Sequence, residues 1–215
     1  MRLAPEGIPV VLAVLLLAAA GFAISATWGS GIASGMGSAA VLVALGLLWF
    51  FRDPERCPPS GDDLVVAPAD GRVIEAGKLD DGRWHVAIFL SILNVHVNRV
   101  PASGTVESVV SHKGSYRPAF TAHAADKNAR IDVVSRTPHG MVSWRQVSGL
   151  LARRLSCRIQ RGDDVTCGER FGIIYFGSRM DVFMPPASEL AIKRGACVRA
   201  GETVIGHLRR MEDEA

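Results

Sequence analysis

Two apolar, β-prone runs meet at a Gly-Ser pair in the segment Ile173-Ile174-Tyr175-Phe176-Gly177-Ser178-Arg179-Met180-Asp181-Val182-Phe183-Met184-Pro185. A β-hairpin turn at this point would favour Asn-Gly or Asp-Gly. Gly-Ser instead places a hydroxyl directly after a residue without a side chain, so the Ser178 oxygen can approach the Gly177 carbonyl without steric hindrance. The pair is either an ordinary kink between two strands or a site of chemistry on the backbone itself.

Four other segments accompany this one along the chain: Phe50-Phe51-Arg52-Asp53-Pro54, Ala67-Pro68-Ala69-Asp70-Gly71, Asn94-Val95-His96-Val97-Asn98-Arg99-Val100-Pro101 and, as a looser match, Asp126-Lys127-Asn128-Ala129-Arg130. Each motif alone is weak, but all five in register are specific. In order and spacing they resemble the short form of the phosphatidylserine decarboxylase family. The resemblance covers the chain from about residue 50 to its end, and residues 176–182 look like the self-cleavage site of that family.

The resemblance implies a proenzyme that cuts its own chain between Gly177 and Ser178. The Ser178 hydroxyl would attack the Gly177 carbonyl, and elimination and hydrolysis would convert Ser178 into a covalent pyruvoyl cofactor. A large chain (residues 1–177) and a small chain (residues 178–215) would then form a heterodimer. The pyruvoyl carbonyl would form a Schiff base with the amine of phosphatidylserine and act as an electron sink, giving phosphatidylethanolamine. A serine phospholipid with another lipid backbone stays an alternative substrate.

Two further catalytic residues, Asp70 and His96, follow from the same resemblance. An aspartate before glycine ordinarily stabilises a tight turn, whereas the family motif makes Asp70 part of the self-cleavage machinery. His96 lies in an alternating segment that predicts a strand, with Asn94 and Asn98 on the same face. The long form of the family has a second histidine where this chain has Arg99, so the base for self-cleavage is left open. The other candidate bases are His112, His123 and His139.

The expected substrate ligands are polar residues around His96. Asn94 and Asn98 would orient the histidine or the head group, and Arg99 and Lys113 would bind the lipid phosphate or the serine carboxylate. A solvated surface charge is the alternative for each cation, as it is for Arg117, Lys127 and Arg130. An apolar lip near the bilayer and packing in the core are the two interpretations of Met180, Phe183 and Met184.

The N-terminal quarter predicts a membrane anchor over residues 1–51. No Asp, Glu, Lys, Arg or His occurs between Gly7 and Phe51. The stretches 8–28 and 32–51 are each long enough, as helices, to cross the ~30 Å hydrocarbon core. A cleaved signal peptide is the competing interpretation of the first stretch, and the second could lie partly in the interface. The flanking basic residues predict that the rest of the chain is on the cytoplasmic side of the cell membrane. These residues are Arg2, Arg52 and Arg56.

A Pro-rich linker over residues 52–63 precedes a predicted catalytic β domain over residues 64–215. The predicted strands are 64–66, 72–76, 84–90, 95–100, 105–111, 131–135 and 141–147. The pattern Ile-x-Arg-Gly-x-x-Val-x-x-Gly-Glu occurs at residue 159 and again at residue 192, and it resembles the turn motif of lipoyl- and biotinyl-type sandwich folds. The expected fold is therefore mainly β, a hybrid-sandwich or barrel-like domain preceded by the two-helix anchor.

Composition limits the other function classes. The formal net charge is only +3, and no basic block alternates with aromatics, so a nucleic-acid partner is not expected. The four cysteines form no Cys-x-x-Cys pair, so neither a metal finger nor a disulfide framework is expected. Two alternatives remain: a non-enzymatic membrane-anchored sandwich adaptor, in which Gly177-Ser178 stays intact, and a membrane-bound zinc hydrolase. The latter lacks a His-x-His signature, because Asn98 follows His96 at that spacing.

Overall fold

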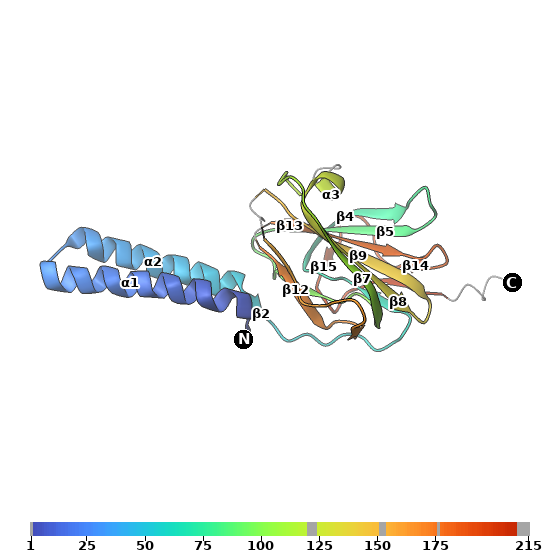
Figure 1. Cartoon of the computed structure of the whole chain (residues 1–215), viewed down its shortest axis with the longest axis horizontal. Helices are drawn as coiled ribbons and strands as arrows, with labels where there is room; N and C mark the ends of the chain where they lie inside the picture. Colours follow the sequence, from blue (N-terminus) through green and yellow to red (C-terminus); the bar gives the residue numbers. More distant parts are fainter. Residues whose placement is uncertain (1, 120–123, 151–153, 176, 210–215) are drawn as a thin grey trace. The chain divides into compact units, whose positions relative to one another are not determined.

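The computed structural model describes residues 2–119, 124–150, 154–175 and 177–209. These residues form two compact units, Met1–Glu55 and Arg56–Ala215. The division falls within the predicted linker. Figure 1 shows a helical hairpin in the first unit and a strongly curved β-structure in the second.

The first unit is a hairpin of two apolar helices, α1 (Ile8–Trp28) and α2 (Gly31–Phe50). Gly29 adopts the left-handed conformation that ends α1, with φ +66°, and the Ser30 hydroxyl accepts a hydrogen bond from the third residue of α2. Both helices are long and apolar enough to cross a membrane, although one or two such helices are weak evidence by themselves. The remaining elements are η1 (Pro5–Gly7), β1 (Arg2–Leu3) and β2 (Arg52–Asp53), the last two paired antiparallel.

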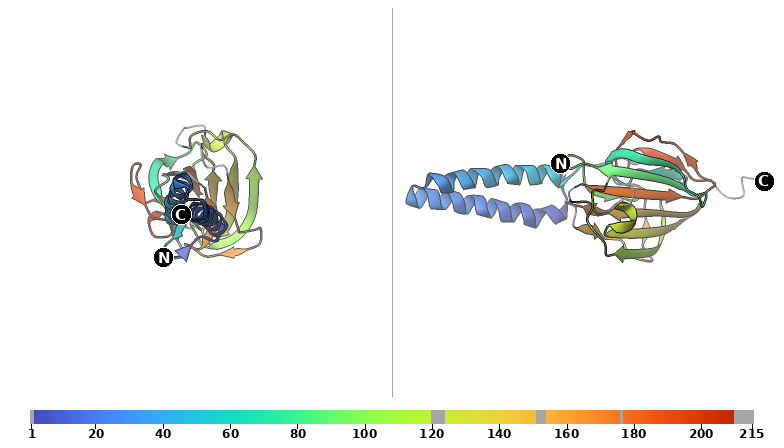
Figure 2. Two further views of the ribbon diagram at one scale, coloured as in Figure 1. Left: turned by 90° about the vertical axis from the view of Figure 1, so that its left-hand side faces the viewer. Right: turned by 90° about the horizontal axis from the view of Figure 1, so that it is seen from above.

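The second unit contains an eight-stranded antiparallel sheet in the order β11-β7-β8-β9-β13-β5-β4-β15, together with the three-stranded sheets β10-β12-β6 and β14-β16-β3. Figure 2 shows the large sheet curling into a half-barrel. The elements are β3 (Leu64–Val66), β4 (Gly71–Lys78), β5 (Trp84–Leu90), β6 (Val97–Arg99), β7 (Gly104–His112), α3 (Ala124–Lys127), β8 (Arg130–Thr137), β9 (Gly140–Val147), β10 (Leu155–Cys157), β11 (Asp164–Val165), β12 (Arg170–Ile174), β13 (Ser178–Met184), β14 (Glu189–Leu190), β15 (Cys197–Val198) and β16 (Val204–His207).

The sequence repeat builds the two edges of the large sheet. Each copy places a glycine with φ +92° before its edge strand, Gly162 before β11 and Gly195 before β15, and each buries its valine, Val165 or Val198. β11 pairs with β7 and β15 pairs with β4. The two small sheets are built in the same way, each from three short antiparallel strands. The second unit is therefore an internally duplicated, mainly β domain, as the repeat predicts.

One hydrophobic core lies inside the curled sheet. Its members include Trp144, Phe171, Met180, Val182 and Met184, all almost fully buried. The two methionines point from β13 into this core, which decides against an apolar lip formed by them. Because side chains alternate along a strand, Ser178 at the start of β13 shares the inward face with Met180. The serine of the Gly-Ser pair therefore points into the protein.

Candidate active site

Ser178 is held at the start of a central strand. β13 lies between β5 and β9, and Ser178 is in register with Leu90 of β5. The residue is fully buried, and its Oγ has no hydrogen-bond partner within the described part of the chain. A buried hydroxyl without a partner is uncommon, because such a group has given up its hydrogen bonds to water. The Ser178 oxygen is thus buried and, within the described residues, not engaged in any hydrogen bond.

Gly177 has a backbone conformation that a side chain would strain, with φ +63°. Its carbonyl oxygen lies against Gly149, just beyond the end of β9. A Cβ atom at Gly149 would be only 2.1 Å from that oxygen. Two glycines therefore shape the bond between residues 177 and 178. Gly177 supplies the turn, and Gly149 supplies the space for its carbonyl.

His96 contacts the backbone N–H of Gly177, one peptide before the bond between residues 177 and 178. It is fully buried, and its Nδ1 is 2.9 Å from the carbonyl oxygen of Asn94. Because a carbonyl can only accept, Nδ1 must carry the proton, which leaves Nε2 as an acceptor. Nε2 accepts a long hydrogen bond, 3.4 Å, from the backbone N–H of Gly177. The predicted histidine and the predicted serine are therefore brought together by the fold.

The strand predicted around His96 is shorter than expected. β6 begins only at Val97, and Asn94 belongs to the preceding turn, where its Oδ1 accepts hydrogen bonds from the backbone and hydroxyl of Ser91. Asn98 is buried, and its Oδ1 accepts a 2.8 Å hydrogen bond from Gln146. The expected common face of three polar residues is thus replaced by a turn that positions His96 through its backbone.

The two predicted cationic ligands differ in exposure. Lys113 is exposed. Arg99 is 4% exposed, and its guanidinium donates to the carbonyl oxygen of Gly168. Its side chain also packs on Gly201, where a Cβ would lie 2.7 Å from the Arg99 Cδ. Arg99 is therefore packed between the two small sheets, and its role as a substrate ligand stays a prediction.

Asp70 is held by an arginine from the linker. Its carboxylate forms an ion pair with Arg56 at 2.9 Å and accepts a 2.7 Å hydrogen bond from the backbone of Ala200. Arg56 also bonds Glu202 at 2.9 Å. Burial raises the pKa of Glu202, but the hydrogen bond and charge of Arg56 outweigh it, so the net pKa is lowered. Arg56 thus lies between two carboxylates.

The internal duplication gives Asp70 a structural counterpart. Ser103 occupies the equivalent place before the glycine of the next copy, and its hydroxyl accepts a 2.9 Å hydrogen bond from the backbone of Cys167. This contact matches the one between Asp70 and Ala200. Securing the turn is thus a role that the two residues share. The pairing with Arg56 is the feature that distinguishes Asp70.

A buried ionic network behind Ser178 was not predicted from the sequence. Arg179 bonds Asp181 at 2.8 Å and both oxygens of Glu75 at 3.0 Å, and His85 lies 2.9 Å from Asp181. Burial lowers the pKa of Arg179, but the charge of Asp181 and the hydrogen bond of Glu75 outweigh it, so the net pKa is raised. The network locks β13 to β5 and β4. The alternation of β13, which places Arg179 and Asp181 on one face, was the available signal.

A cavity of about 610 Å³ opens beside the histidine turn. It is lined by Asp70, Gly71, Arg72, Phe89, Ser91, Asn94, Cys197, Val198 and Arg199. Two cations therefore face a cavity that shares Asn94 with His96 and Asp70 with the Arg56 pair. Neither Arg72 nor Arg199 was singled out from the sequence, because β4 and β15 are neighbours only in the folded sheet.

The other titratable groups are placed elsewhere. His112 lies 3.1 Å from Asp132, and His139 lies near Asp62, while His123 is outside the described residues. Burial raises the pKa of Cys167 to about 11, so this thiol stays protonated near neutral pH. Within the described ranges, no group of three His, Cys, Asp or Glu side chains could hold a metal ion. That part of the structure gives no support to the zinc hydrolase alternative.

Comparison with known proteins agrees with this geometry. The family model described as "Phosphatidylserine decarboxylase" matches residues 44–206. The chain belongs to the phosphatidylserine decarboxylase family. Relatives named phosphatidylserine decarboxylase proenzyme include one from Salinibacter ruber, 46% identical over 75% of each chain, and one from Chlorobium phaeovibrioides, 42% identical over 80% of this chain and 81% of the relative. Another, from Nitratidesulfovibrio vulgaris, is 38% identical over 95% of this chain and 94% of the relative.

This membership supports the enzymatic interpretation over the adaptor. Relatives of nearly the same extent carry the word proenzyme in their names, and the alignment with the Nitratidesulfovibrio vulgaris protein runs through the apolar hairpin as well as the β domain.

Proposed function

We propose that the chain is a membrane-bound proenzyme that cleaves itself between Gly177 and Ser178 and then decarboxylates phosphatidylserine to phosphatidylethanolamine. The observation that carries this proposal is the geometry around Gly177 and Ser178. The Ser178 hydroxyl is buried without a partner, the Gly177 carbonyl lies in the space left by Gly149, and His96 holds the Gly177 N–H. The names of the relatives supply the substrate.

Self-cleavage would use only groups of this chain and one water molecule. The Ser178 Oγ adds to the Gly177 carbonyl carbon, and the amide nitrogen leaves as an amine, so the peptide becomes an ester. Loss of the Ser178 Cα proton then expels the Gly177 carboxylate and leaves an enamine at residue 178. Water adds to its imine tautomer and ammonia leaves, so a ketone remains. These steps convert Ser178 into a pyruvoyl group without an external oxidant.

The surroundings of Ser178 fit such a group, because the serine is already at a chain position that is buried, dry and free of competing hydrogen bonds. A pyruvoyl group supplies an electron sink for decarboxylation. His96, whose Nε2 is 3.4 Å from the Gly177 nitrogen, would move a proton at the substrate. Arg72 and Arg199 would bind the phosphate or carboxylate of the head group in the adjacent cavity.

The proposed location is the cell membrane, with the catalytic domain on the cytoplasmic side. A hairpin of two spanning helices returns the chain to the side on which it began. Arg2 precedes α1 and Arg52 follows α2, and an excess of basic residues marks the cytoplasmic side of membrane proteins. The β domain continues from that side.

The proposal is tested with the full-length protein in mixed micelles of detergent and phosphatidylserine. We expect release of carbon dioxide and formation of phosphatidylethanolamine. Reduction with borohydride during turnover should attach the lipid amine to residues 178–215 only. A protein that stays uncut and releases no carbon dioxide would favour the adaptor, and faster turnover of an ether-linked serine phospholipid would change the backbone of the substrate.

Substituting Gly149 by alanine tests whether self-cleavage needs the space that Gly149 leaves for the Gly177 carbonyl oxygen. The new Cβ would lie 2.1 Å from the Gly177 oxygen, so the carbonyl must move, and a displacement of about 1 Å can cost 10²-fold in rate. We expect self-cleavage to slow by about 10²-fold, measured as the fraction of uncut chain over time. Gly77→Ala is the matched control, because its Cβ would meet open space. Equal cleavage in both variants, with equal melting temperatures, would remove Gly149 from the mechanism.

Substituting Asp70 by serine separates the turn from the carboxylate. Serine makes the equivalent hydrogen bond at position 103, so the variant should keep the bond to Ala200 and lose only the charge that pairs with Arg56. We expect self-cleavage to slow by about 10²-fold or more, the range for a lost acid–base group. Ser103→Ala, which removes the matching turn contact, should cleave normally. A fast-cleaving Asp70→Ser protein would reduce Asp70 to a turn residue.

A further inference from the structure

Several turns of the β domain gather at one end of the large sheet. Ser178 is in register with Leu90, and Val147 is in register with both Arg179 and Arg130. The turns that follow β5, β7 and β9 therefore lie at the end where β13 begins. We call this end, formed by residues 91–94, 113–118 and 148–150, the scissile end.

The scissile end exposes large apolar side chains. Ile92 is 53% exposed, Leu93 is 69% exposed and Leu150 is 57% exposed. Ile92 and Leu93 form a turn beside Asn94, which positions His96, and Leu150 follows Gly149, which seats the Gly177 carbonyl. Three aliphatic side chains on neighbouring tips are more than the scattered exposure of a soluble surface.

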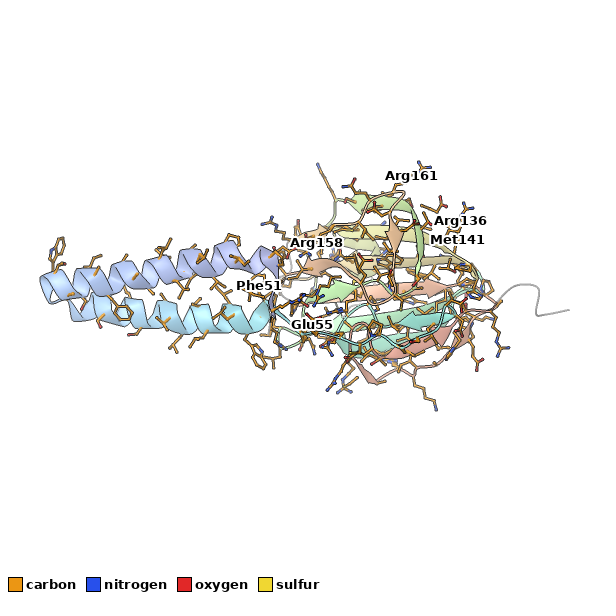
Figure 3. The ribbon with its side chains drawn as sticks, turned by 90° about the horizontal axis from the view of Figure 1, so that it is seen from below. Phe51, Glu55, Arg136, Met141, Arg158 and Arg161 are labelled. Atoms are coloured by element: carbon orange, nitrogen blue, oxygen red, sulfur yellow. The ribbon has the colours of Figure 1, made fainter. Side chains whose placement is uncertain are left out.

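Charge distinguishes the two ends of the sheet. The scissile end and the adjoining helix α3 carry the exposed cations Lys113, Arg117 and Lys127 and one exposed acid, Asp126. The opposite end carries the exposed acids Asp62, Asp80, Asp81, Asp163 and Asp164 and the exposed cations Lys78, Arg83, Arg136 and Arg161, of which Arg83 and Arg136 pair with acids. In Figure 3, Arg136 and Met141 mark this opposite end. Exposed apolar side chains and cations at one end of a sheet are the pattern of a surface that binds anionic lipid.

We infer that the scissile end is a membrane-docking surface that inserts Ile92, Leu93 and Leu150 into an anionic phospholipid bilayer. This inference rests on the proposed function and adds where the lipid enters. Ser91 and Asn94, on either side of the apolar tip, both line the cavity that holds Arg72 and Arg199. Insertion of the tip brings the mouth of this cavity to the level of the lipid head groups. A phospholipid then reaches the site without leaving the membrane.

The docking surface is tested by photo-crosslinking with the full-length protein. A photoreactive p-benzoylphenylalanine replaces Leu93, Leu150 or Met141, and each protein is reconstituted into vesicles of phosphatidylcholine and phosphatidylglycerol. Phosphatidylglycerol is anionic but lacks the serine amine, so adducts report contact with the bilayer and not capture of substrate. Met141 is the matched control, because it is 45% exposed at the opposite end.

We expect lipid adducts at positions 93 and 150 to exceed those at 141 at least about tenfold, and to decrease at high salt because surface attraction is screened. Adducts of equal yield at all three positions, or none at 93, would overturn the inference. The readout needs no activity, so it is independent of the proposed function.

A second variant, Ile92→Asp with Leu93→Asp, links the surface to lipid access. It should self-cleave normally and raise KM for vesicle-bound phosphatidylserine about tenfold, with kcat little changed. An unchanged KM would contradict lipid entry at this end.

Discussion

Replacing Ser178 by alanine leaves the protein as one uncut chain of 215 residues without decarboxylase activity. No hydroxyl is then available to add to the Gly177 carbonyl, and no residue can become the electron sink. The expected loss of activity is complete within the limits of the assay. Denaturing electrophoresis and carbon dioxide release measure the two effects. Ser178→Cys should still cleave slowly, since a thiol can make the same acyl shift.

Ser188 provides a matched control for this prediction. Its hydroxyl is also buried, 6% exposed, and also lacks a hydrogen-bond partner within the described residues. The residue before Ser188 is Ala187, not a glycine in the left-handed conformation as at Gly177. The Ser188→Ala protein should therefore be cut and active like the parent. If Ser178→Ala were still cut, another nucleophile would have to be found. If Ser188→Ala also stayed uncut, the effect would report a damaged fold.

Replacing His96 by alanine has the second largest expected effect. The variant removes the only side chain that contacts the Gly177 N–H in the described structure. We expect slower self-cleavage, and a decarboxylation rate in the matured fraction that falls by about 10²–10⁴, as for a lost acid–base group. Activity is normalised to the amount of cut chain, which separates the two steps.

His112→Ala is the control for the histidine. His112 is also near the scissile end, but its ring pairs with Asp132 on the outer surface of the sheet. Its removal should change neither step. Normal turnover by matured His96→Ala protein would remove His96 from the decarboxylation mechanism.

Local patterns predicted most of the fold. The charge-free stretches 8–28 and 32–51 agree with α1 and α2 to within one residue at each end, and the predicted strand 84–90 agrees with β5. The repeat predicted two equivalent glycine turns, and the structure places them at the two edges of one sheet. These features could be predicted because hydrophobic periodicity, glycine turns and charge-free stretches are each visible within a short segment of sequence.

The site was predicted only in part. The Gly-Ser pair and His96 were predicted from short motifs and a family resemblance, but the contact of Gly149 with Gly177 and the pairing of Arg56 with Asp70 join segments far apart in the sequence. The order of the strands in the sheet decides which distant segments meet, and the spacing of hydrophobic residues in the sequence does not reveal that order. The burial of Arg99 was not predicted for the same reason, since Gly168 and Gly201, which it contacts, come from the repeat.

The intact mass of the purified protein tests the central claim most directly. We predict two chains, residues 1–177 ending in a carboxylate and residues 178–215 beginning with a pyruvoyl group. The masses of the two chains should sum to the mass of the precursor plus one water minus one ammonia. The small chain should be lighter by one ammonia than a chain with a free serine terminus. A single 215-residue chain that decarboxylates phosphatidylserine, or a small chain that begins with an intact serine, would contradict the account.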